Sequence, residues 1–227
     1  MNYFQPNDLN SALDVLQNNS DLTIAAGCTD LFPITNNMSL DKNILDITNI
    51  KSIKGFQFNG KETKIGSATT WTDIINENLP SCYDMLKACA KEVGSIQIQN
   101  LGTIGGNICN ASPAADSIPC LLALDAKLEL SSANNQRIIP IDEFILGSRK
   151  TKLEQGEILT SIIIPKEKEN GSSSFRKIGA RKYLVISISM VACRILISNN
   201  IIKDISISVG SCSCLLYTSP SPRDRSS

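Results

Sequence analysis

The stretch Leu101-Gly-Thr-Ile-Gly-Gly-Asn-Ile108 continues into Cys109-Asn-Ala-Ser-Pro-Ala-Ala-Asp116, and a shorter stretch, Ile24-Ala-Ala-Gly-Cys-Thr-Asp-Leu31, has the same character. Each is interpreted as an apolar strand that stops at glycine, followed by backbone N–H groups beside small hydroxyl or amide side chains. Glycine permits the positive-φ geometry that turns successive N–H groups toward one point, which suits a phosphate. One such loop is weak support, but two in one domain indicate a diphosphate held from both sides. The pair therefore predicts a dinucleotide cofactor.

Each motif alone has a simpler interpretation. The first could be a strand end at which Thr29 or Asp30 caps a helix, and Gly105-Gly-Asn107 could be a hairpin turn. A third element favours the cofactor. Asp116 is expected to cap a helix, and its carboxylate could accept hydrogen bonds from a ribose or from the edge of an isoalloxazine ring.

The composition excludes several other function classes. The 227 residues have zero net charge and a pI near 6.3, which gives no basic surface for nucleic acid or acidic lipid. The chain lacks a run of about 18 apolar residues, and its start lacks the features of a signal peptide, so the expected location is the cytoplasm, away from membranes. There is no histidine, which removes histidine-based nucleophile activation and metal ligation. The eight cysteines show no Cys-x-x-Cys spacing, and no metal site or catalytic side chain is predicted.

Hydrophobic periodicity predicts an α+β fold. Asn7 or Asp8 is expected to cap the first helix, and Thr70 or Thr72 the second. The expected helices cover residues 7–18, the segment from the second cap through 75, 83–93, 116–124 and 184–197. The expected strands cover residues 23–26, 44–47, 53–58, 64–70, 127–130, 136–140, 157–164, 175–179 and 201–209.

The motifs resemble those of the FAD-binding (medium) subunit of molybdenum hydroxylases of the xanthine dehydrogenase type. Four stretches between about residues 1 and 211 carry the resemblance: Ala26-Gly-Cys-Thr-Asp-Leu31, Ile65-Gly-Ser-Ala-Thr-Thr70, Val93 through Ile108 with Ala111 through Asp116, and Glu157-Ile-Leu-Thr-Ser-Ile-Ile-Ile-Pro165. It implies a flavin domain of the vanillyl-alcohol-oxidase type, with FAD between two subdomains at residues 1–53 and 54–165. The start of a truncated C-terminal domain would follow at 175–211.

The resemblance also implies which residues bind the cofactor. The diphosphate would lie against Ile24, Ala25, Ala26, Gly27, Cys28, Thr29, Asp30 and Leu31, and against Thr103, Ile104, Gly105, Gly106 and Asn107. Asp116 would contact the flavin, Leu159 would pack against it, and Lys177 would reach it from the second domain, unless Lys177 is an ordinary surface lysine. Three positions depart from the family pattern: Cys28 replaces a common glycine, Gln99 replaces an arginine that would help the phosphates, and Val93 replaces a phenylalanine of some relatives.

The implied function is electron transfer. According to the resemblance, a molybdenum-binding large subunit would oxidise the substrate, a small subunit would carry [2Fe–2S] clusters, and FAD on this chain would pass the electrons to NAD or another acceptor. Two alternatives remain open: a stand-alone flavin reductase of the same fold, which would be active by itself, and a degenerate module that only binds partners.

Residues 212–227 differ in style from the rest of the chain and resemble translated adapter DNA. We expect this segment to be non-native, so that Cys212 and Cys214 form no metal motif.

Overall fold

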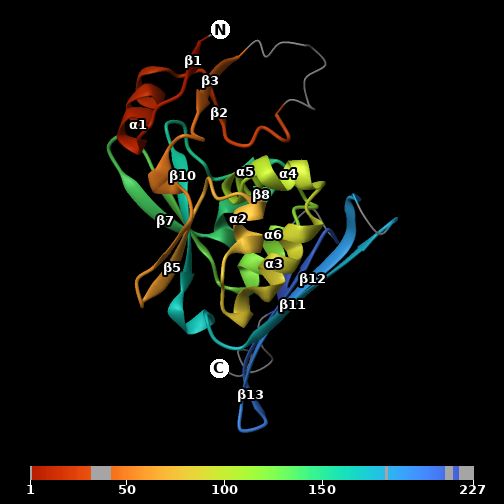
Figure 1. Cartoon of the computed structure of the whole chain (residues 1–227). Coiled ribbons are helices and arrows are strands. Elements are labelled where there is room, and N and C mark those ends of the chain that lie inside the picture. The colour runs from red at the N-terminus through yellow and green to blue at the C-terminus, as the bar shows by residue number, and fades with distance from the viewer. Residues whose placement is uncertain (1, 32–41, 182–183, 213–216, 220–227) are drawn as a thin grey trace.

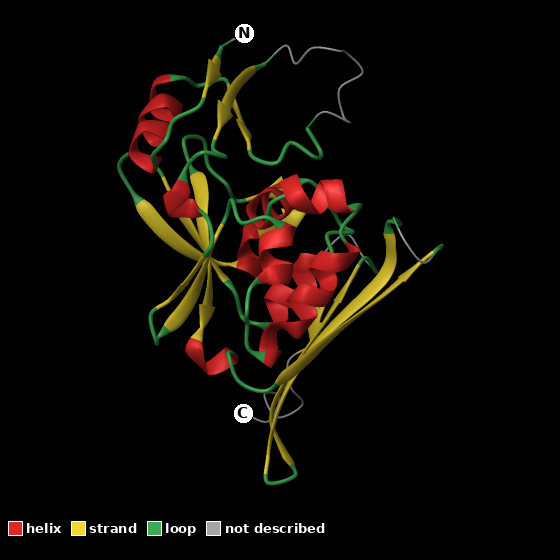
Figure 2. Ribbon diagram, in the orientation of Figure 1, coloured by secondary structure: helices red, strands yellow, loops and turns green. Residues whose placement is uncertain are grey.

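The computed structural model describes residues 2–31, 42–181, 184–212 and 217–219. It mixes helices and strands in three parts, which Figure 1 colours from red at the N-terminus to blue toward the C-terminus. A small N-terminal sheet lies above a five-stranded sheet, and a bundle of short helices separates the five-stranded sheet from a long C-terminal sheet (Figure 2). No helix among these described residues is long and apolar enough to cross a membrane.

The N-terminal part is a parallel three-stranded sheet with one helix. The helix α1 begins after Asp8, whose carboxylate accepts from the Ser11 N–H at 2.9 Å, so the predicted cap is confirmed. Its apolar stripe, which includes Leu13 and Leu16, is buried in a cluster with Leu45 of β3. The elements are β1 (Tyr3–Phe4), α1 (Leu9–Asn18), β2 (Leu22–Ala25), β3 (Asn43–Asp46) and the 3-10 turn η1 (Lys51–Ile53), with strand order β1-β3-β2.

The middle part is an antiparallel sheet with strand order β4-β5-β10-β6-β7. The central strand β10 contains Ile162, Ile163 and Ile164, all at most 4% exposed, because both faces of this strand are covered. The strands are β4 (Phe56–Phe58), β5 (Glu62–Gly66), β6 (Lys127–Ser131), β7 (Gln136–Pro140) and β10 (Ile158–Pro165); β8 (Ile145–Gly147) and β9 (Lys150–Thr151) form a separate hairpin.

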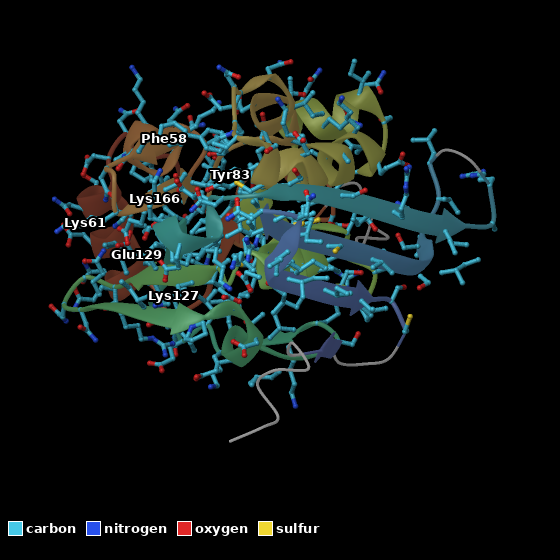
Figure 3. All side chains as sticks on the ribbon, turned by 90° about the horizontal axis from the view of Figure 1, so that it is seen from below. Phe58, Lys61, Tyr83, Lys127, Glu129 and Lys166 are labelled. Atoms are coloured by element: carbon cyan, nitrogen blue, oxygen red, sulfur yellow. The ribbon has the colours of Figure 1, made fainter. Side chains whose placement is uncertain are left out.

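Side-chain hydrogen bonds and an ion pair also link neighbouring strands of the middle sheet. Glu129 of β6, labelled in Figure 3, accepts from Lys64 Nζ at 2.8 Å and from Ser161 Oγ at 2.7 Å. Burial raises the pKa of this carboxyl, but the contacts with Lys64, Ser161 and Thr160 together outweigh burial and hold the pKa below its ordinary value. Lys61 and Lys166 meet at the end of the sheet, where the Lys166 N–H donates to the Lys61 carbonyl at 3.1 Å. The Lys64, Glu129 and Ser161 contacts thus join the three central strands β5, β6 and β10.

The helices pack their apolar faces against the middle sheet and the C-terminal sheet. Met85, Leu86 and Cys89 of α3 are fully buried in the main core. The second predicted cap is Thr70, which forms a reciprocal pair with Asp73 at the start of α2. The helical elements are α2 (Trp71–Asn76), η2 (Ser81–Tyr83), α3 (Asp84–Glu92), α4 (Ile96–Leu101), α5 (Ile104–Asn110), α6 (Ser117–Ala123), α7 (Ile141–Phe144) and η3 (Lys166–Lys168).

The C-terminal part is an antiparallel sheet, and here one prediction is wrong. Residues 184–197 were expected to form a helix, but the structure has the long strand β12 (Ser187–Ser198) between β11 (Ser172–Gly179) and β13 (Ile201–Gly210). Both edges of β12 are paired, and its inward side chains Met190, Ala192 and Arg194 are at most 1% exposed. Within the predicted non-native tail, β14 (Tyr217–Ser219) pairs with β13, and Cys212 is a free, exposed thiol, while Cys214 lies outside the described residues.

Candidate functional site

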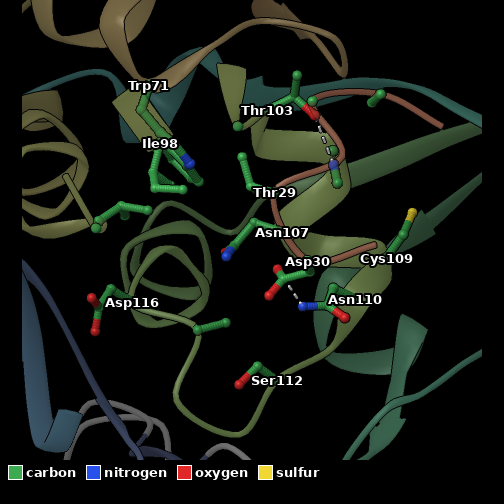
Figure 4. Close-up of a pocket in the computed structure, with 18 of the residues that line it drawn as sticks. Thr29, Asp30, Trp71, Ile98, Thr103, Asn107, Cys109, Asn110, Ser112 and Asp116 are labelled. Atoms are coloured by element: carbon green, nitrogen blue, oxygen red, sulfur yellow. Dashed lines mark hydrogen bonds between the residues drawn. The ribbon is translucent and has the colours of Figure 1, made fainter. Parts of the chain in front are cut away.

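One cavity of about 890 Å³ lies where the three parts meet, at the upper end of the roughly 300–1,000 Å³ common for ligand sites. Every residue predicted to bind the cofactor lines it, except Ile104, whose side chain is fully buried in the core. The predicted residues that line it are Ile24, Ala25, Ala26, Gly27, Cys28, Thr29, Asp30, Leu31, Thr103, Gly105, Gly106, Asn107, Asp116, Leu159 and Lys177. Figure 4 shows that Thr29, Asn107 and Asp116 surround the same space from different segments.

The first glycine segment follows the end of β2, as predicted. Its Leu31 N–H donates back to the Cys28 carbonyl at 3.2 Å, whereas the N–H groups of residues 27–30 have no backbone acceptor among the described residues. The left-handed residue here is Cys28, at φ 56°, and not Gly27. Gly27 is required for another reason, because a Cβ there would collide with the Leu101 carbonyl oxygen. The N–H groups of residues 27–30 can therefore donate to a ligand in the cavity that these residues line.

The second glycine segment differs from the prediction. It is the junction of two helices, α4 and α5, rather than a strand followed by a loop, and its glycines do not have positive φ. The N–H groups of residues 104–107 already donate to Thr69 O, Ser67 O, Thr103 Oγ1 and Thr103 O. A Cβ on Gly105 would approach Ser67 Cβ to 2.6 Å, so this glycine permits close packing of α5 against the end of β5. The segment thus contributes little free backbone to the cavity.

Two side chains of the second segment remain available. The Thr103 oxygen accepts from Gly106 at 3.1 Å, which leaves its own O–H to donate. Ser117 Oγ donates to Asn107 Oδ1 at 2.6 Å, so the two N–H donors of the Asn107 amide are directed away from Ser117, and Figure 4 shows the amide nitrogen at the centre of the site. These groups can bind oxygen acceptors of a ligand.

Asp116 lies before α6 but does not cap it with its side chain, which corrects the prediction. Its carboxylate instead accepts from Lys177 Nζ at 2.6 Å and from the Ser187 hydroxyl. The side chains of Lys177 and Asp116 are 8% and 7% exposed, so the alternative of Lys177 as an ordinary surface lysine is wrong. The C-terminal sheet thereby brings a paired cation to the cavity wall.

Two cysteines, Cys28 and Cys109, are among the residues that line the cavity. Burial, with a smaller contribution from the Asp46 carboxylate, raises the pKa of the Cys28 thiol, and burial raises that of Cys109 to about 12. Both are therefore neutral near pH 7 and are poor nucleophiles. The described cysteines are free, and no cluster of three or more potential metal ligands occurs among the described residues.

Several lining residues were not predicted from the sequence. Trp71, the only tryptophan of the chain, is 1% exposed, Asn110 is the last residue of α5, and Arg149 and Ser187 come from two further segments. Only Asn110 and Trp71 had a sequence signal, through their position beside the family motifs. Of the positions that depart from the family pattern, Val93 lines the cavity, whereas Gln99 is absent from the lining and donates to the Lys91 carbonyl at 3.1 Å.

Comparison with known proteins identifies the class. Residues 1–167 match the family described as the FAD binding domain in molybdopterin dehydrogenase, and the chain belongs to this family. It is 32% identical over 212 residues to the xanthine dehydrogenase FAD-binding subunit of Escherichia coli O157:H7, covering 92% of this chain and 73% of that protein. It is 34% identical to the nicotinate dehydrogenase FAD-subunit of Eubacterium barkeri, covering 82% and 65%.

A solved structure agrees with this assignment. Carbon monoxide dehydrogenase from Hydrogenophaga pseudoflava contains a chain with a TM-score of 0.85 and 25% identity, over 96% of this chain and 77% of that chain. The chain is therefore an FAD-binding subunit of a molybdenum hydroxylase-type dehydrogenase, an oxidoreductase component. FAD fits the donors described above: the N–H groups of residues 27–30, which have no backbone acceptor among the described residues, and the Thr103 hydroxyl and Asn107 amide, which line the same cavity.

Proposed function

We propose that this subunit holds FAD in the cavity and serves as the electron outlet of a larger complex. The observation that carries the proposal is the convergence of the two glycine segments, Asp116, Leu159 and Lys177 on one cavity from separate parts of the fold. Electrons would arrive from [2Fe–2S] clusters on a small partner subunit, after a molybdenum-binding large subunit has oxidised the substrate. The final acceptor would be NAD or another oxidant.

FAD, when bound, supplies the ability to accept electrons singly and release them as a pair. The chain's own residues bind and orient it. The free N–H groups of the first loop and the Asn107 amide would hold the diphosphate, because oriented backbone and amide dipoles stabilise anions. Leu159, 4% exposed on β10, would supply an apolar wall. The buried Asp116–Lys177 pair would set the charge beside the flavin ring.

The test is to purify the chain, record its visible absorption spectrum and identify any chromophore released by heat. Trp71 gives a second readout, because a flavin that binds in this cavity is expected to quench the emission of the only tryptophan. Stoichiometric FAD with quenching is expected. A folded, colourless protein whose Trp71 emission ignores added FAD would overturn the proposal and favour the degenerate binding module. Turnover by the isolated chain with its own organic substrate would instead favour the stand-alone reductase.

A further inference from the structure

Among the residues that the structure describes, the charges around the cavity leave the cofactor phosphates with one available cation. Five charged side chains of the described residues line the cavity, of which two, Arg149 and Lys177, are cations; the others are Asp30, Glu92 and Asp116. A diphosphate carries negative charge that is costly to bury without a cation. Lys177 is already neutralised by Asp116 at 2.6 Å, in a site where both side chains are less than a tenth exposed. Lys177 is therefore poorly placed to serve the phosphates as well.

Arg149 has no such carboxylate partner among the described residues. Its guanidinium donates to the carbonyl oxygen and to the side-chain oxygen of Asn110. The Asn110 amide nitrogen in turn donates to Asp30 Oδ2 at 2.8 Å, an interaction drawn as a dashed line in Figure 4. Asn110 thus links the arginine to the first glycine loop, in which the N–H groups of residues 27–30 have no backbone acceptor among the described residues. The remaining guanidinium donors are available to an anion that lies against that loop.

The backbone at Arg149 is shaped to place this side chain. Arg149 lies in the turn between β8 and β9 at φ 57°, a left-handed conformation that glycine or asparagine would adopt more easily. Its N–H donates to the Ala111 carbonyl at 2.8 Å, which fixes the turn against the end of α5. A strained position that is anchored at both backbone and side chain favours a role for the side chain itself.

We propose that Arg149 is the cation that binds the cofactor diphosphate, and that Asn110 is a positioning residue that holds it beside the first glycine loop. This inference rests on the proposed function. Gln99, where the resemblance implied the loss of an arginine, donates to the Lys91 carbonyl and does not line the cavity, so this position offers the phosphates no donor. The planar guanidinium suits two phosphate oxygens at once.

The experiment titrates the full chain with FAD, and separately with riboflavin, which lacks phosphate, using Trp71 emission and flavin absorbance. The variants are Arg149→Gln, Arg149→Lys and, as a matched control, Lys150→Gln, which removes the neighbouring exposed charge outside the cavity. Titrations at about 50 and about 300 mM salt report the electrostatic contribution, because added salt screens exposed charges.

Arg149→Gln is expected to weaken FAD binding at least about tenfold at low salt, to reduce its salt dependence and to leave riboflavin binding unchanged. Arg149→Lys should be intermediate, and Lys150→Gln should match the wild type. Asn110→Ala alone should weaken FAD binding. The same substitution in the Arg149→Gln variant should weaken FAD binding little further, because the two residues act together. Equal loss of FAD and riboflavin affinity, or an Arg149→Gln variant that behaves as Lys150→Gln does, overturns the inference. Failure of the wild type to bind FAD defeats the proposed function itself, and the inference with it.

Discussion

Lys177 Nζ of β11 lies 2.6 Å from Asp116 Oδ2 at the start of α6, and Ser187 of β12 donates to the other carboxylate oxygen. The contact joins residues 61 positions apart and fastens the C-terminal sheet to the helices that wall the cavity. Because both side chains are almost fully buried, each charge depends on the other for compensation.

The pair predicts a large and specific stability effect. Lys177→Met leaves the Asp116 carboxylate buried without its cation, so the free energy of unfolding should fall by about 3–5 kcal/mol. The exposed pair Lys152–Glu143, at 3.3 Å, is the matched control, and Lys152→Met should cost less than about 1 kcal/mol. Urea unfolding of the FAD-free chain measures both. The double variant Lys177→Met with Asp116→Asn should recover part of the lost stability, because it no longer buries an unpaired carboxylate. Equal losses for Lys177→Met and Lys152→Met would contradict a larger contribution of the buried pair to stability.

Much of the fold could be predicted from local signals. The helices α1 and α3 have apolar residues at helical spacing, and Asp8 and Thr70 supply side-chain caps that the structure contains. β12 was missed because Ile, Val and Leu are crowded along 184–197, and its exposed face also carries apolar residues such as Ile188 and Val191, which removes the clean alternation of apolar and polar residues. Whether such a segment forms a helix or a strand depends on its pairing with strands that are distant in the sequence.

The candidate site was predictable as a set of residues but not as a set of roles. The segments that line the cavity followed from their glycines, yet Gly27 and Gly105 serve close packing rather than left-handed turns. Asp116 stood where a cap was expected, but Lys177 and Ser187 compete for its carboxylate from 61 and 71 residues away. Arg149 carries no local signal, because its position depends on the contact between its turn and α5.

Cys28 predicts a stabilising substitution. Its φ of 56° is unfavourable for a residue with a Cβ, and glycine adopts that conformation freely. Cys28→Gly should raise the free energy of unfolding by up to about 1 kcal/mol, after the extra freedom of glycine in the unfolded chain is subtracted. Cys193→Gly, in the middle of β12, should instead lower it by roughly 1 kcal/mol. The urea midpoints of the two variants give the sign of each change in the free energy of unfolding. A Cys28→Gly variant less stable than the wild type would contradict the proposed backbone strain at Cys28.

Alanine substitutions at two glycines of the cavity, Gly27 and Gly106, should distinguish an effect on stability from an effect on FAD affinity. Gly27→Ala places a Cβ against the Leu101 backbone, so it should cost about 2 kcal/mol or more of stability and displace the first loop. Gly106→Ala meets only Thr103 Oγ1 at 3.0 Å, and alanine favours the helix α5, so stability should be kept. Because Gly106 lines the cavity, FAD affinity should still fall. Unfolding and FAD titration of each variant test this, and unchanged affinity in Gly106→Ala would place the cofactor elsewhere.

The contact between Arg137 and Glu157 predicts the acid limit of stability. Arg137 donates to both carboxylate oxygens, at 2.7 and 2.9 Å, and the Glu154 N–H adds a third bond at 2.8 Å. The Arg137 bonds, ahead of the opposing effect of burial, hold the pKa of Glu157 below its ordinary value of 4.5. The folded state therefore binds this proton less readily than the unfolded chain does.

The resulting stabilisation is fully present above pH 4.5 and is lost as the pH falls through the lower pKa of the folded state. Stability measured by urea unfolding should thus decline below about pH 4.5, and Glu157→Gln should be less stable at pH 7 but show a shallower decline in acid. The exposed Glu143→Gln is the control, whose pH profile should follow that of the wild type. Parallel profiles for Glu157→Gln and the wild type between pH 3 and 6 would assign the acid limit to other carboxyls, of which Glu129, held by Lys64, is the next to test.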